Sequence, residues 1–123
     1  MSNSGLAAVL DAPRMAIGST YGYMRVPCNV PDRKVCRLEN QVVRYAKARG
    51  LYFVRFFSEF NCGSREAFEE LVVELIHTDS HHVVVPSLRH LSHNALLQDL
   101  MLDRLSFTAH ADVYAVHLKS KFE

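Results

Sequence analysis

The pattern that most constrains this fold is a regular alternation of short β-type runs with longer runs of helical period, which starts near Ile17. Runs rich in β-branched and aromatic residues predict strands, and amphipathic runs predict helices. Strands that alternate with helices form βαβ units around a mostly parallel sheet. We therefore predict a three-layer α/β fold: a mostly parallel four-stranded sheet with helices on both faces. The expected strands are 19–26, 51–57, 81–86 and 111–116, and the expected helices are 37–49, the run after Ser64, and 92–106.

Proline and glycine mark where these elements end. Pro27 closes the first expected strand, and with Pro31 it marks residues 27–37 as a loop, because a proline cannot donate to a sheet ladder. Gly50 is a suitable C-terminal residue for the first expected helix. The uninterrupted run Val83-Val84-Val85 is typical of a strand that is buried on both faces.

Size and charge restrict the function classes. With 49% hydrophobic and 22% charged residues, 123 residues suit one globular core. We expect a flexible N-terminal arm over residues 1–16 and a single domain over 17–123. The formal net charge of +1 provides no long-range field for a polyanion, so strong autonomous binding to DNA is not expected.

The cysteines and histidines predict neither a disulfide framework nor a metal centre. Cys28, Cys36 and Cys62 are odd in number and widely spaced, which favours reduced thiols in a cytoplasmic protein. The histidine pairs at 81–82 and at 90 and 93 have no acidic or cysteine partner at ligand spacing, so we expect no metal and no cofactor. No run reaches the roughly 20 apolar residues that a membrane span needs, so we expect no membrane association.

In an open parallel sheet, binding groups lie beyond the carboxyl ends of the strands, which directs attention to residues 25–29, 58–65 and 86–94. Motifs in and beside these loops resemble the N-terminal catalytic domain of the serine recombinase (resolvase/invertase) family. The resemblance extends from about Thr20 to Val116, and it implies a resolvase-like domain and a bacterial source. The motifs are Tyr21-Gly22-Tyr23-Met24-Arg25-Val26, Leu38-Glu39-Asn40-Gln41, Phe56-Phe57-Ser58-Glu59-Phe60-Asn61-Cys62-Gly63, Arg65-Glu66-Ala67-Phe68 and Leu88-Arg89-His90-Leu91-Ser92-His93.

The resemblance also implies that the active site is degenerate. Pro27 stands where the family has its nucleophilic serine, and two histidines replace the arginines of the third loop. Cleavage through a seryl-phosphate linkage needs a hydroxyl nucleophile and several guanidinium groups to neutralise the phosphoryl group. We therefore expect a catalytically inactive domain. Its vestigial site positions are Arg25, Pro27, Gln41, Glu59 (for the family's aspartate), Arg65, His90 and His93.

An enzymatic alternative rests on Cys28, because a thiolate beside Arg25 could attack phosphorus. The chain would then be an active DNA strand-transferase or a phosphoesterase that uses Cys28 with Arg25 and Arg65. A small packing role for the cysteine, and salt bridges from the two arginines to Glu59 or Glu66, are the simpler alternatives.

The favoured hypothesis is a protein-interaction or regulatory module that forms a homodimer or binds a regulatory protein partner, and that reaches DNA only weakly or through a partner. The third expected helix has more apolar residues than one buried face needs. The arm, through Leu6, Val9 and Leu10, is the alternative cover for this surface. The expected interface residues are Leu97, Leu100, Met101, Leu102 and Leu105.

Overall fold

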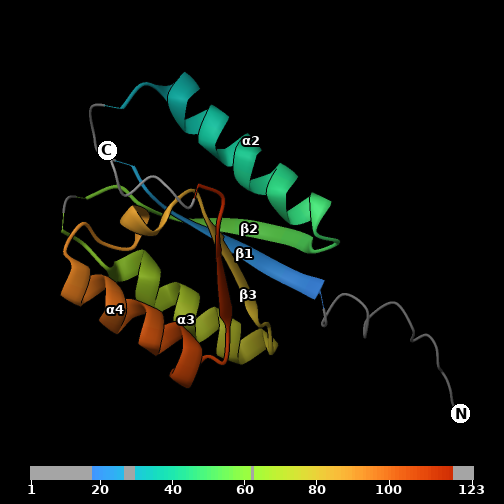
Figure 1. Cartoon of the computed structure of the whole chain (residues 1–123), viewed down its shortest axis with the longest axis vertical. Helices are drawn as coiled ribbons and strands as arrows, with labels where there is room; N and C mark the ends of the chain where they lie inside the picture. The colour runs from blue at the N-terminus through green and yellow to red at the C-terminus, as the bar shows by residue number, and fades with distance from the viewer. Residues whose placement is uncertain (1–17, 27–29, 62, 118–123) are drawn as a thin grey trace, which may run out of the picture.

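The computed structural model describes residues 18–26, 30–61 and 63–117, so the expected arm at 1–16 lies outside the described residues. Its sheet has the strand order β2-β1-β3-β4, and each neighbouring pair is parallel. Figure 1 shows α2 on one face of the sheet and α3 with α4 on the other. The predicted three-layer α/β fold is therefore confirmed. The elements are β1 (Ser19–Arg25), α2 (Asp32–Ala48), β2 (Tyr52–Glu59), α3 (Glu66–Thr78), β3 (His82–Val85), the 3-10 turn η2 (Leu88–His90), α4 (Ala95–Asp103), the π turn η3 (Arg104–Thr108) and β4 (Asp112–Ala115).

Helix α2 begins well before its expected start at Arg37, so the prediction of a loop over 27–37 was wrong for its second half. Pro31 occupies the N-cap position with φ −62°, and Asp32 stands in the first turn. A proline at the start of a helix loses no hydrogen bond, and an acidic first turn complements the helix dipole. Pro31 therefore starts this helix instead of belonging to a longer loop.

Helix α4 begins later than predicted, at Ala95. The side chain of Asn94 caps it, since Oδ1 accepts a hydrogen bond from the Leu97 backbone N–H at 3.0 Å. Ser64 lies two positions before α3, and its Oγ accepts from the Glu66 N–H at 3.2 Å. Both helices thus start at the carboxyl edge of the sheet. In each, a polar side chain accepts a hydrogen bond from a backbone N–H of the first turn.

Gly22 in the middle of β1 is required by packing. A Cβ at this position would lie 2.5 Å from the ring of Phe56 and 3.1 Å from that of Phe53. These two rings lie 4.7 Å apart on the α2 side of the sheet, where they pack against the cluster of Val42, Ala46 and Val84. The missing side chain lets the aromatic pair approach the central strand.

The expected interface residues, which lie on α4 and η3, need correction. Met101 and Leu105 are buried in the core, and Leu97 and Leu102 are partly buried against it, so only Leu100 of the five is exposed. The helix turns these residues toward α3 and the sheet, because they follow the spacing of its inner face. The apolar residues that face outward on this side are Val73 and Ile76 of α3 and Leu96, Leu100 and Phe107 of α4 and η3; we call these five the α3/α4 apolar surface.

Candidate functional site

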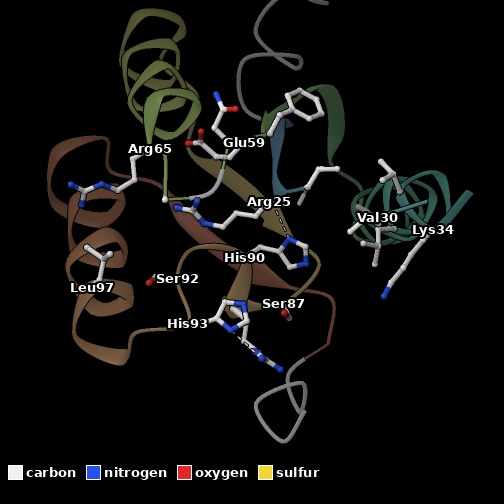
Figure 2. Close-up of a pocket in the computed structure, with 17 residues that line it drawn as sticks. Arg25, Val30, Lys34, Glu59, Arg65, Ser87, His90, Ser92, His93 and Leu97 are labelled. Carbon is white, nitrogen blue, oxygen red and sulfur yellow. Dashed lines mark hydrogen bonds between the residues drawn. The ribbon is translucent and has the colours of Figure 1, made fainter. Parts of the chain in front are cut away.

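A cleft of about 870 Å³ opens at the carboxyl edge of the sheet (Figure 2). The end of β1, the loops after β2 and β3, the first turns of α2 and Leu97 of α4 line it. Figure 2 shows Val30 and Lys34 on the side opposite Arg65 and Leu97. Five of the vestigial positions lie around this one cleft: Arg25, Glu59, Arg65, His90 and His93.

Arg25 links the three loops of the carboxyl edge. Its Nε donates to the carbonyl oxygen of Leu91 at 3.2 Å, and its Nη1 donates to that of Ser64 at 2.8 Å. Its backbone N–H donates to Nδ1 of His90 at 3.0 Å. The guanidinium thus uses two of its five N–H groups on the protein backbone. Arg25 therefore has a structural role in the described chain.

His90 is held as a neutral imidazole. Nδ1 accepts the Arg25 N–H, which places the ring proton on Nε2. Burial lowers the pKa of His90 to about 4, and the charges of His93, Arg25 and Arg89 act in the same direction. A neutral imidazole cannot provide the permanent charge of the arginine that the resemblance places at this position.

The carboxyl group of Glu59 is buried and accepts two hydrogen bonds from within the protein. Its Oε2 accepts from the Tyr23 hydroxyl at 2.9 Å and from the Phe68 backbone N–H at 2.8 Å. Burial raises the pKa of Tyr23, and the hydrogen bond to Glu59 adds to this rise. Since Phe68 lies in the first turn of α3, Glu59 caps that helix from the end of β2. It is 3% exposed, so it holds the two elements together.

Arg65 and Lys34 differ from Arg25 in their surroundings. Both side chains are exposed on the wall of the cleft, and neither has a hydrogen bond or ion pair from its charged group within the part of the chain that the structure describes. On the third loop, an Nη2 of Arg89 lies 3.1 Å from Nδ1 of His93. The cleft thus offers cationic groups on several of its walls.

The other two vestigial positions, Gln41 and Pro27, are not among the described residues that line the cleft. Oε1 of Gln41 lies 2.9 Å from Nε2 of His117, where it links α2 to the segment after β4. Pro27 and the alternative nucleophile Cys28 lie outside the described residues.

Sequence reasoning missed one wall of the cleft. Val30, just before α2, lines it together with Lys34, Val35 and Leu38 from the first turns of that helix. Pro27 and Pro31 favoured a loop for Val30, Lys34 and Val35, whereas Leu38 fell within the expected helix 37–49. The sequence Pro31-Asp32, followed by apolar positions at helical spacing, was the signal that could have placed the helix start correctly.

In residues 18–26, 30–61 and 63–117, no three His, Cys, Asp or Glu side chains converge as a metal site would require. Within the same ranges, no helix has the length and apolar character needed to cross a membrane.

The parallel sheet and the cleft at its carboxyl edge define an α/β domain of the kind that the motifs indicated. No family model and no curated protein matches the sequence. Among solved structures, the chain is similar to the C-terminal catalytic domain of ISC1926 TnpA, an IS607-like serine recombinase. The TM-score is 0.69 at 15% identity, and the match covers 85% of this chain and 74% of that one.

The chain is also similar to the N-terminal catalytic domain of TP901-1 integrase, with a TM-score of 0.61 at 17% identity. That match covers 80% of this chain and 76% of the other. The protein therefore has the fold of a serine recombinase catalytic domain, as its motifs predicted.

Proposed function

We propose that this chain is a non-catalytic, resolvase-like module that acts by binding, with residues 17–123 as a single domain. The observation that carries the proposal is the engagement of its site residues with the protein itself. Arg25 donates to two backbone carbonyls, and neutral His90 accepts a backbone N–H. Groups that stabilise a transferring phosphoryl must instead be directed at the charge that develops on it.

The sequence supports the same conclusion from another direction. Pro27 has no nucleophilic atom, and His90 and His93 stand where the resemblance places two guanidinium groups. A fold can persist after its chemistry is lost, because packing and catalysis depend on different residues. The apolar core of this chain is complete, with Tyr23, Leu71 and Leu75 fully buried.

A nicking and religation assay on supercoiled DNA tests the absence of catalysis. We expect neither activity, for the wild type or for Cys28→Ala. Cleavage by the wild type that Cys28→Ala abolishes would establish the strand-transferase or phosphoesterase alternative, in which Arg25 and Arg65 would hold the phosphate. Cleavage that survives this substitution would also contradict the proposal.

The α3/α4 apolar surface supports self-association as the binding activity. Leu96, Leu100 and Phe107 are 71%, 57% and 74% exposed, and α3 and α4 lie on the same face of the sheet (Figure 1). Large apolar side chains gathered on one face are typical of interfaces. A homodimer through this surface, with DNA reached weakly or through a partner, is therefore our favoured mode of action.

Sedimentation at micromolar concentration tests this mode. Phe107→Ser should shift the wild-type dimer toward monomer, because it removes a large apolar group from the surface. Phe60→Ser is the matched control: Phe60 is 65% exposed but lies at the cleft, so this variant should remain dimeric. A monomeric wild type would refute self-association.

A further inference from the structure

The charge balance of the cleft selects an anionic ligand. Its lining includes four cationic side chains and one carboxyl group. That carboxyl, Glu59, is already bonded to the Tyr23 hydroxyl and the Phe68 N–H, so it is not directed at a ligand. The cationic side chains are Arg25, Lys34, Arg65 and Arg89.

Arg65 is the cation best placed to hold the anionic group. Its guanidinium is exposed on the cleft wall and has no hydrogen bond or ion pair across the described ranges, whereas Arg25 is committed to carbonyls of Ser64 and Leu91. A planar guanidinium binds carboxylate, sulfonate or phosphate oxygens with two parallel hydrogen bonds. The amides at the start of α3 offer less, since Glu59 and Ser64 occupy two of them.

The rest of the lining requires that the ligand also has an apolar body. Among the described residues, six apolar side chains line the cleft, and Figure 2 shows Val30 opposite Arg65. A volume of about 870 Å³ lies within the range of small-molecule sites, which bury most of the ligand against such side chains. A bare inorganic anion would leave these side chains uncovered. The six are Val26, Val30, Val35, Leu38, Phe60 and Leu97.

We propose that the cleft binds a small amphipathic organic anion, with its charged group on Arg65 and its apolar body against the wall that includes Val35 and Leu38. The site reuses the carboxyl edge of the recombinase fold for ligand binding, and it would let a metabolite regulate the module. This inference goes beyond the proposed function and does not depend on self-association. A nucleic acid backbone would meet the cations but has no apolar body for the α2 wall.

A pair of fluorescent probes separates the two parts of the site. The first is 8-anilinonaphthalene-1-sulfonate, an aromatic anion, and the second is N-phenyl-1-naphthylamine, which has the same rings without the sulfonate. Arg65→Gln should weaken binding of the anionic probe by roughly tenfold or more, the value of one charge-assisted hydrogen-bonded pair. It should leave the neutral probe unchanged. Leu38→Asn should weaken both probes.

Two control variants locate the binding site. Arg44→Gln removes an exposed arginine of α2 that does not line the cleft, and Phe107→Ser alters the α3/α4 apolar surface. Neither should change the affinity of the anionic probe. Thermal melts of all four variants establish that each is folded, and a substitution at exposed Arg65 leaves the core intact.

Three results would overturn the inference. The anionic probe could bind Arg65→Gln as tightly as the wild type, it could lose its site in Phe107→Ser, or inorganic phosphate or a short DNA duplex could displace it at equal concentration. Sedimentation and nicking measure the proposed function separately, so failure of one proposal does not hide failure of the other.

Discussion

The partly buried imidazole of His90 makes the stability of the fold depend on pH. An unfolded histidine has a pKa of about 6.5, whereas burial, and then the charges of His93, Arg25 and Arg89, lower the pKa of His90 to about 4. Between these values the unfolded chain binds a proton that the folded chain does not, so stability falls as the pH falls. Above pH 6.5 both states are neutral, and the full stability is present.

The linkage relation gives the size of this effect. From these two pKa values, the free energy of unfolding should fall by about 2 kcal/mol between pH 7 and pH 5. The fall should reach about 3 kcal/mol once the pH is below both pKa values. Protonation would also remove the acceptor for the Arg25 N–H, which is the structural reason that the neutral form is preferred.

Urea unfolding at pH 7 and pH 5, followed by circular dichroism, measures the loss. His90→Asn is the comparison, because its amide oxygen can accept the Arg25 N–H but cannot be protonated. The wild type should lose about 2 kcal/mol more than this variant, which is about 1 M in the urea midpoint. The other six histidines are present in both proteins, so their contributions cancel in the comparison. Equal losses in the two proteins would refute the account of His90.

Three further substitutions test the packing. Gly22→Ala should destabilise by about 1–3 kcal/mol, because the new methyl meets the Phe56 ring, and thermal melts should show a much smaller loss when Phe56→Ala is already present. Glu59→Ala should lose about 2–4 kcal/mol in urea unfolding by leaving two donors unpaired, and Glu59→Gln, which keeps an acceptor, should lose less. Asn94→Ala should lower the free energy of unfolding by about 1 kcal/mol, and Asn94→Ser, whose hydroxyl can still cap α4, should lower it much less. Equal melting temperatures for these two variants would show that the Asn94 cap does not stabilise the helix.

Local pattern was sufficient to predict the architecture and the position of the cleft. The valine run at 83–85 is β3, and motifs far apart in the sequence meet at one edge because parallel strands end there. The same reasoning could not show which side chains are committed to the backbone. The bond from the Arg25 N–H to His90 joins residues 65 positions apart, and no local pattern encodes it.

The apolar character of α4 explains the other error. Leucine or methionine occupies several successive positions of this helix, so the sequence does not distinguish an inner face from an outer one. Packing against α3 and the sheet selects Met101 and Leu105 for the core and leaves Leu96 and Leu100 outside. Only the arrangement of neighbouring elements determines that choice.

The central place of β1 has a consequence for biosynthesis. This strand is made first, yet its sheet partners come much later: Thr20 pairs with Phe53 of β2 and with His82 of β3, 62 residues downstream. At translation rates of roughly 5–20 residues per second, β1 waits about 3–12 seconds for its second neighbour. During that interval, the side chains of Tyr21, Tyr23 and Met24, all buried in the finished domain, remain open to other chains and to chaperones.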